Sequence, residues 1–231
     1  MSKGLIIKEA FLENKISSKP CRVLLLGASV GQEWNLSDLP KRINNNKYTF
    51  EIVAVFSFDK SKALDEILMR PKRRFHFTRT YLKSLFKPAL QKPNVIIIKE
   101  CAAYFPGDLE KYKTLVQKWV SQIVSADSKP VLATVVPVTQ EHSQKRSGRL
   151  TGILEYNDWI REYTRESGIN CLDLEAALRI SDKDRTLSPD LTSSDGLHLN
   201  RKAYDILDRI LEDFLIKYTK NQKKLENGIH S

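Results

Sequence analysis

The chain has 231 residues and a formal net charge of +10, with 41% hydrophobic and 29% charged residues. A chain of this length folds as one domain of ordinary size, and its composition excludes a disordered, collagenous or low-complexity protein. The longest apolar runs, such as 131–138, are too short to span a membrane, and acidic residues interrupt the N-terminal stretch where a secretory signal needs an apolar run. We therefore expect a cytoplasmic protein with no transmembrane segment.

The cysteines and histidines do not form a metal-binding pattern. Cys21, Cys101 and Cys171 cannot all pair, and the four histidines show none of the short spacings of a zinc site. Each cysteine lies in or beside an apolar run, which is typical of buried free thiols in a reducing compartment. The sequence therefore predicts no structural metal, and nothing in it requires a cofactor.

Five short apolar runs, rich in β-branched residues, alternate along the chain with longer segments of helical period. The runs are 22–27, 50–58, 94–99, 130–137 and 169–174. Because they are continuously apolar rather than alternating, they are typical of strands that are covered on both faces.

The segments between these runs carry the helical period. Residues 108–124 and 201–218 each place their apolar side chains on one face of a helix, and 61–70 has a shorter helical pattern. Asn200 is a suitable N-cap for the last helix, and Gly168 is a suitable stop for the helix before it.

The order of these elements predicts the fold class. We expect an α/β fold with a single doubly wound domain over 21–218, built on a five-stranded, mostly parallel sheet with helices on both faces. An N-terminal extension (1–20) precedes this domain and a basic C-terminal tail (219–231) follows it. In such a sheet, ligands bind beyond the carboxyl ends of the strands, so the residues that follow each strand are candidates for a site.

The first predicted strand ends in the string Gly27-Ala28-Ser29-Val30-Gly31. Ser29 stands where a dinucleotide fingerprint needs its second glycine, and no Gly-Lys-Ser/Thr string follows as in a P-loop. The string does match G-x-S-x-G, the nucleophile elbow, in which a sharp strand-to-helix turn exposes a serine hydroxyl. Its simpler interpretation is a turn of small residues that lets a helix pack on the sheet.

A serine nucleophile needs a base, and an acid that orients the base. Both occur just before the last predicted helix, in the string Ser194-Asp195-Gly196-Leu197-His198. Asp195 can accept a hydrogen bond from one ring nitrogen of His198 while the other nitrogen faces the serine. The simpler interpretation is an Asp-Gly turn beside an incidental histidine.

Together, the two motifs resemble those of the SGNH (GDSL-type) hydrolases, in which the serine follows the first strand and a D-x-x-H motif precedes the last helix. The resemblance extends over the layout of residues 21–218. It implies a flavodoxin-like architecture, a catalytic triad of Ser29, Asp195 and His198, no cofactor, and small acyl esters such as O-acetylated carbohydrates as substrates.

One departure from that family's pattern follows the second strand. The family has a glycine there, whose N–H helps to form the oxyanion hole, but this chain has no glycine from 32 to 106. Because any residue other than proline has a backbone N–H, we expect the oxyanion hole to be formed by Ser29 and Ser57.

A second departure follows the third strand, where Ala102 occupies the position of the family's asparagine. The loss of one oxyanion donor typically lowers turnover about 10²–10³-fold. Lys99 and Tyr104 are the nearest candidates to replace it, and the sequence leaves open whether one of them does so or activity is reduced. Glu100 is expected to be solvated or paired with Lys99.

The positive charge is concentrated between the second and third predicted strands. Residues 67–99 contain nine Lys or Arg and no acid, with aromatic residues between them. We expect Arg73, Arg74 and Arg79 to attract an anionic substrate. A solvated basic face or a lipid-binding surface is compatible with the same pattern. We do not expect nucleic acid as a partner, because no recognised nucleic-acid-binding module accompanies the charge.

The sequence therefore predicts a serine esterase that cleaves, or transfers, a small acyl group on an ester substrate such as an anionic O-acylated carbohydrate or lipid. The alternative is a catalytically impaired protein of the same fold that uses its basic segment to bind anionic partners. The two differ in whether the chain turns over an ester.

Overall fold

The computed structural model describes residues 20–43, 45, 47–69 and 92–228. Its strands are β1 (Cys21–Gly27), β2 (Tyr48–Ala54), β3 (Val95–Lys99), β4 (Lys129–Ala133) and β5 (Asn170–Leu172). Its α-helices are α1 (Ser29–Glu33), α2 (Leu39–Arg42), α3 (Ser61–Leu68), α5 (Leu109–Ser125), α6 (Gln140–Lys145), α7 (Arg149–Ser167), α8 (Leu174–Leu178) and α9 (Arg201–Gly228). Short 3-10 helices are η1 (Leu36–Asp38), η3 (Ala102–Tyr104) and η4 (Pro189–Leu191).

The five strands form one parallel sheet in the order β2-β1-β3-β4-β5. β1 lies between β2 and β3, so Leu25 pairs with Ile52 on one side and with Ile97 on the other. The chain therefore extends the sheet first to one side of β1 and then to the other. In doubly wound sheets, ligands bind at such a reversal, beyond the carboxyl ends of the strands. The predicted fold class is confirmed, and the reversal lies at the strand that precedes Ser29.

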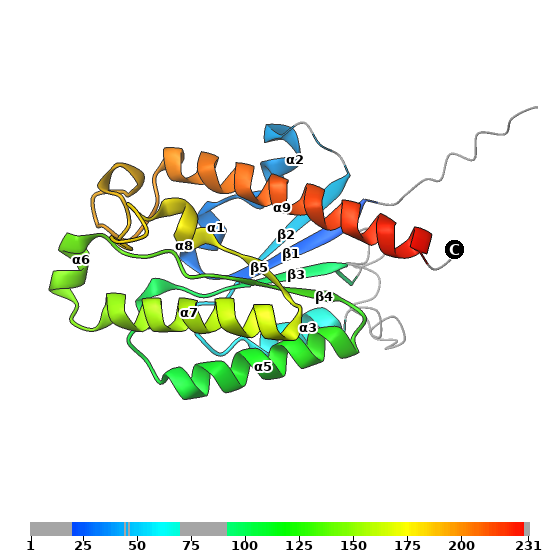
Figure 1. Ribbon diagram of the computed structural model, residues 1–231, viewed down its shortest axis with the longest axis horizontal. Helices are drawn as coiled ribbons and strands as arrows, with labels where there is room; N and C mark the ends of the chain where they lie inside the picture. Colours follow the sequence, from blue (N-terminus) through cyan, green and yellow to red (C-terminus); the bar gives the residue numbers. More distant parts are fainter. Residues whose placement is uncertain (1–19, 44, 46, 70–91, 229–231) are drawn as a thin grey trace, which may run out of the picture.

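Alternate side chains of the strands pack against two layers of helices, one on each face of the sheet (Figure 1). Val23 and Leu25 of β1 belong to the core beneath α1, α2, α8 and α9, whereas Leu24 and Leu26 belong to the core beneath α3, α5 and α7. All four side chains are buried. Because both faces of the sheet are covered, the strands are continuously apolar in sequence.

Two strands are shorter than their apolar runs predict. β2 ends at Ala54 rather than at 58, and β4 ends at Ala133 rather than at 137. After β4, Asn157 of α7 replaces the neighbouring strand as a partner. Its Oδ1 accepts from Val135 N at 2.7 Å, and its Nδ2 donates to Val135 O at 2.8 Å. Because the Asn157 side chain provides the hydrogen bonds of this buried peptide group, the chain can leave the sheet before its apolar run ends.

The predicted helix ends agree with the structure at two points. Asn200 caps α9, since its Oδ1 accepts from Ala203 N at 3.2 Å, and Gly168 ends α7 with a left-handed φ of 69°. Helix α9 continues to Gly228, well beyond the predicted end at 218. None of the helices in the described part of the chain combines the length and the apolar character needed to cross a bilayer.

Helix α9 is anchored to the first helical segments by Asp208. The carboxylate accepts from Trp34 Nε1 at 2.8 Å and from Arg42 Nε at 2.6 Å. The hydrogen bond to Asp208 raises the pKa of Arg42. This contact holds α9 against α1 and α2.

Candidate active site

Ser29 is the first residue of α1 and lies directly beyond the carboxyl end of β1. The turn needs a small residue because α1 packs closely on the sheet: a Cβ at Gly31 would lie 3.2 Å from Leu25 Cδ2. Ser29 is half-buried, and its neighbours Ala28 and Val30 are buried. The glycine thus lets the helix pack, as the simpler interpretation held, and the same turn leaves the serine partly exposed at the edge of the sheet.

Asp195 and His198 form a hydrogen-bonded pair in the loop before α9. Asp195 Oδ2 lies 2.5 Å from His198 Nδ1, and Asp195 Oδ1 accepts from the N–H groups of Leu197 and His198 at 2.9 and 2.8 Å. Burial alone would raise the pKa of Asp195, but the hydrogen bonds from His198, Leu197 and Ser193 outweigh it and hold the pKa well below its usual range. An ionised carboxylate can only accept, so Nδ1 of His198 carries the ring proton and Nε2 of the neutral ring is unprotonated.

Gly196 gives this loop its shape. It has a left-handed φ of 70°, and a Cβ there would lie 2.5 Å from Thr139 Oγ1 and 3.1 Å from His142 Cβ. Its carbonyl accepts from Thr139 N at 3.1 Å. Only glycine combines this conformation with so close an approach. The Asp-Gly turn expected from the sequence is therefore present, and it is part of the geometry that pairs Asp195 with His198.

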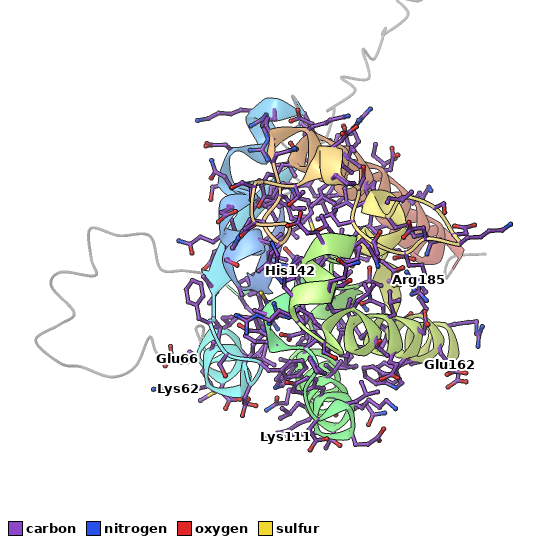
Figure 2. The ribbon with its side chains drawn as sticks, turned by 90° about the vertical axis from the view of Figure 1, so that its left-hand side faces the viewer. Lys62, Glu66, Lys111, His142, Glu162 and Arg185 are labelled. Carbon is purple, nitrogen blue, oxygen red and sulfur yellow. The ribbon has the colours of Figure 1, made fainter. Side chains whose placement is uncertain are left out.

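A second histidine supports the loop from α6. His142 lies at the end of the sheet that faces the viewer in Figure 2, with its Nδ1 3.0 Å from Asp195 O and its Nε2 2.7 Å from Arg149 Nη1. A guanidinium only donates, so His142 Nε2 accepts, and Nδ1–H donates to the Asp195 carbonyl. Arg149 also donates from Nε to Phe105 O at 3.1 Å. His142 and Arg149 thus connect the Asp195 loop with the segment after β3.

Sequence reasoning missed His142 and Arg149. Both lie in 140–150, a stretch with little periodicity, and His142 is 53 positions away from its partner Asp195. The only signal in the sequence is that His142 is one of four histidines.

Helix α9 links the Asp195–His198 loop, which precedes it, to α1, which begins with Ser29. In the first turn of α9, the hydroxyl of Tyr204 donates to Glu33 Oε2 at 3.2 Å and to Val30 O at 3.4 Å, both in α1. The structure therefore brings Asp195 and His198 into direct contact and places Ser29 on the adjoining helix. Within the described residues, Ser29 Oγ and His198 Nε2 form no direct hydrogen bond, so the predicted contact between them stays a prediction.

The two predicted oxyanion donors have backbone N–H groups that the fold does not use. In the ranges that the structure describes, neither the N–H of Ser29 nor the N–H of Ser57 donates to a protein atom. Ser57 is exposed in the loop after β2, and Ala102 begins η3 after β3. The N–H groups of Ser29 and Ser57 thus have no acceptor among the described residues, as the predicted oxyanion hole requires.

Both side chains considered as replacements for the asparagine hydrogen-bond to backbone carbonyls. Lys99 Nζ, which is buried, donates to Glu100 O at 3.0 Å, and Tyr104 Oη uses its one proton to donate to Val55 O at 3.2 Å. Burial lowers the pKa of Lys99 and raises the pKa of Tyr104. The hydroxyl of Tyr104 is therefore committed to the protein, and the predicted donors stay the backbone N–H groups of Ser29 and Ser57.

Glu100 is neither solvated nor paired with Lys99, so this expectation was wrong. Its side chain is fully buried and pairs with Lys60, which lies in the loop after β2. Strand geometry explains the error, because consecutive residues such as Lys99 and Glu100 point to opposite faces of a sheet. Burial raises the pKa of Glu100 to about 7, against the opposing effect of the Lys60 charge.

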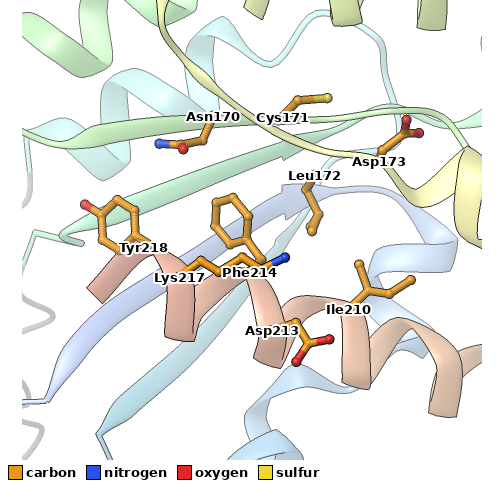
Figure 3. A pocket seen from close by; sticks show the side chains of 9 residues that line it. All are labelled: Asn170, Cys171, Leu172, Asp173, Ile210, Asp213, Phe214, Lys217 and Tyr218. Atoms are coloured by element: carbon orange, nitrogen blue, oxygen red, sulfur yellow. The ribbon is translucent and has the colours of Figure 1, made fainter. Parts of the chain in front are cut away.

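A cleft of about 440 Å³ opens beside the Asp195–His198 loop. Hydroxyl and amide side chains make up most of its lining: Thr139, Gln140, Gln144, Thr192, Ser193 and Ser194. Another cleft, of about 530 Å³, lies between β5 and the middle of α9 (Figure 3). Ser29, Asp195 and His198 line neither cleft, but Ser193, Ser194 and Gly196 of their loop line the first, which therefore borders the candidate site.

Other sequence predictions concern charge and metal binding. Arg73, Arg74 and Arg79 lie outside the described residues. Among the residues that the structure does describe, no group of three or more His, Cys, Asp or Glu side chains could hold a metal ion.

Solved structures similar to this chain are lipases and esterases. A GDSL-like lipase from Bacteroides thetaiotaomicron has a TM-score of 0.60 at 15% identity, over 87% of this chain and 90% of its own. A catalytic mutant of an acetylxylan esterase from Geobacillus stearothermophilus has a TM-score of 0.55 at 12% identity, over 82% and 91%. A psychrotrophic esterase from Pseudoalteromonas has a TM-score of 0.53 at 13% identity, over 86% and 98%.

No protein-family model and no curated protein sequence matches the chain. The structural matches nevertheless agree with the motifs, and the chain has the SGNH (GDSL-type) hydrolase fold that its sequence predicts. At these low identities the matches show the fold alone.

Proposed function

We propose that the chain is a serine hydrolase that cleaves, or transfers, a small acyl group on an ester. The Asp195–His198 pair carries this proposal, because its geometry gives the ring the tautomer that a general base needs. The pair lies in the D-x-x-H motif of the SGNH hydrolases and just before α9, whose Tyr204 donates to the helix that begins with Ser29. The lipases and esterases among the similar structures support the same class of reaction.

In the proposed reaction, Ser29 Oγ attacks the ester carbonyl while His198 Nε2 accepts the hydroxyl proton. Asp195 keeps the ring oriented and stabilises the imidazolium that forms. The N–H groups of Ser29 and Ser57 donate to the carbonyl oxygen as it becomes an oxyanion. His198 then gives the proton to the leaving alcohol, and the acyl group remains on Ser29. Attack by water completes hydrolysis, whereas attack by an alcohol or sugar hydroxyl completes acyl transfer.

Turnover of p-nitrophenyl acetate and butyrate, together with labelling by a fluorophosphonate, tests this function. We expect both for the native chain and neither for Ser29→Ala, with the melting temperature changed by only a few degrees. Ser37→Ala is the control, since it removes a serine that is more exposed than Ser29 and should be labelled normally. Undiminished labelling of Ser29→Ala would show that another residue is the nucleophile.

Absence of both turnover and labelling in the folded native chain would favour the alternative, a binding protein of the same fold with impaired catalysis. The observation that favours this alternative is Ala102, which replaces the asparagine of the family and has no side-chain donor. The same assay therefore decides between the two functions.

We infer further that the acyl group is carried by an anionic carbohydrate or lipid. The net charge of +10 and the acid-free segment 67–99 support an anionic substrate. Replacing Arg73, Arg74 and Arg79 together by Gln should slow turnover of a negatively charged ester, with a loss that shrinks as salt rises. A neutral ester should be barely affected. Equal losses on both esters would show that the segment is only a solvated surface.

A further inference from the structure

Two fully buried residues of opposite charge, Lys60 and Glu100, join the loops that follow β2 and β3. The Lys60 ammonium pairs with the Glu100 carboxylate, and it also donates to Ser57 O at 3.1 Å and to Phe58 O at 3.3 Å. An ammonium has three protons to donate, so all of them have a partner. Lys60 therefore binds two consecutive peptide carbonyls in the loop after β2 and, at the same time, the Glu100 carboxylate at the end of β3.

The sheet order places this contact at the candidate site. β2 and β3 are not neighbours, because β1 lies between them and leads to Ser29. A contact from the loop after β2 to the residue after β3 must therefore cross the carboxyl end of β1. The hydrogen bond from Tyr104 Oη to Val55 O, at 3.2 Å, crosses it as well. The two loops that flank Ser29 are thus fixed to each other.

Stability alone does not account for the ion pair. Oε1 of Glu100 is buried and, in the part of the chain that the structure describes, has no hydrogen-bond partner. The rings of Phe58, Tyr104 and Trp119 lie 5.4–5.9 Å from Lys60 Nζ and offset part of the cost of burying the ammonium. Even so, apolar residues of similar size often stabilise a core as well as a buried ion pair, and the unpaired oxygen adds a further cost. A costly group beside a candidate site favours a role in that site.

We propose that Lys60 and Glu100 are positioning residues that hold the backbone donors of the oxyanion hole in place. The inference rests on the proposed hydrolase function. By fixing the carbonyls of Ser57 and Phe58, Lys60 restricts rotation of the peptide groups next to the Ser57 N–H, since each peptide group is planar and moves as a unit. Donors held in advance stabilise an oxyanion without reorganising during the reaction. The ion pair thus supports a loop that lacks the glycine, and a strand end that lacks the asparagine, of the SGNH family.

The test replaces the pair by apolar side chains of similar length, as Lys60→Met with Glu100→Met. We expect the double variant to fold, because such replacements of buried ion pairs are often neutral. Its kcat on p-nitrophenyl acetate should fall at least about tenfold, towards the roughly 10²–10³-fold loss typical of one missing oxyanion donor. Its KM should change less than about threefold, because the lost interaction acts on the transition state.

The control is a second double variant, Arg161→Met with Asp173→Asn. It breaks an ion pair of 2.8 Å beside the edge strand β5, away from the loops in question. The variant also removes the contacts of Arg161 with Asp158 and with the buried Glu175, so it weakens the fold. We still expect its kcat to stay within about twofold of the native value, because this network is distant from the loops after β2 and β3. A similar loss of kcat in both double variants would show that any weakening of the fold slows the reaction, and would overturn the positioning role.

Backbone amide exchange provides a readout that does not depend on turnover. We expect the amides of 56–59 and 101–103 to exchange faster in the Lys60/Glu100 double variant and those of β4 to be unchanged. If the native chain turns over no ester, the proposed function fails, and this comparison still decides whether the pair holds the loops. If the double variant does not fold, Glu100→Gln, which keeps the shape of the side chain, should show the same effects to a smaller extent. Unchanged kcat in an active enzyme, or unchanged exchange in both loops, would overturn the inference.

Discussion

Replacing Gly196 by alanine tests whether its turn controls the pairing of Asp195 with His198. A left-handed φ of 70° costs a non-glycine residue about 1 kcal/mol. The added Cβ would also lie 2.5 Å from Thr139 Oγ1, so the two segments must move apart. This movement breaks the two hydrogen bonds that cross between the segments, from Thr139 N to Gly196 O and from His142 Nδ1 to Asp195 O, each worth about 1 kcal/mol. We therefore expect the free energy of unfolding to fall by about 3 kcal/mol, from these three contributions.

Gly168→Ala is the matched control. Gly168 has nearly the same φ, 69°, but a Cβ there would meet nothing within 4 Å. It lies at the end of α7 and contacts none of the candidate site residues. This variant carries the backbone strain without the close contact, so its free energy of unfolding should fall by only about 1 kcal/mol and its kcat should not change.

Urea denaturation and ester turnover, measured on both variants, check this reasoning. A displacement of a catalytic group by about 1 Å can cost 10²-fold in rate, so we expect kcat of Gly196→Ala to fall by about that factor. The difference between the two variants isolates the contact with Thr139 from the strain that they share. Equal losses of stability, or an unchanged kcat for Gly196→Ala, would refute the idea that this turn sets the position of His198.

Other variants test single contacts. Asp195→Asn presents an amide that can donate to His198 Nδ1 and favour the wrong tautomer, so kcat should fall about 10³–10⁴-fold while the melting temperature is nearly kept; a small loss of kcat would exclude Asp195 as the orienting acid. Burial raises the pKa of Glu100 to about 7, so the stabilisation from its protonated form is fully present below about pH 4.5 and is lost as the pH rises through 7. The free energy of unfolding of the native chain minus that of Glu100→Gln should therefore decrease over that range, and a flat difference would contradict the burial argument. Asp108 caps α5 by accepting from Lys111 N at 3.0 Å, so Asp108→Ala should lower the free energy of unfolding by about 1 kcal/mol without changing kcat.

The strands and the type of sheet could be predicted because burial on both faces leaves a direct mark in the sequence. The run at 22–27 is apolar at every position from Val23 to Leu26, and it forms β1 with one residue of difference at its start. The ends of β2 and β4 could not be predicted in the same way. Asn157, far along the chain, decides where β4 ends, and the apolar run itself carries no trace of that partner.

In the candidate site too, contacts between residues close in sequence could be predicted, whereas contacts between distant residues could not. Asp195 and His198 are three residues apart, so a local motif identifies both and also predicts their contact, which the structure shows. Lys60 and Glu100 are 40 positions apart, and their pairing depends on the face from which each side chain leaves its strand or loop. The local pattern therefore pointed to the wrong lysine, because Lys99 is the nearer neighbour of Glu100 in sequence.

The Asp208 carboxylate joins α9 to Trp34 and Arg42 across 174 and 166 positions of the chain. During translation, β1 and Ser29 leave the ribosome early and Asp208 leaves it late. On the proposed mechanism, a nascent chain, or a product of premature termination that ends before α9, holds the serine without a docked base. On that mechanism, the serine gains its base only once α9 has docked against Trp34 and Arg42.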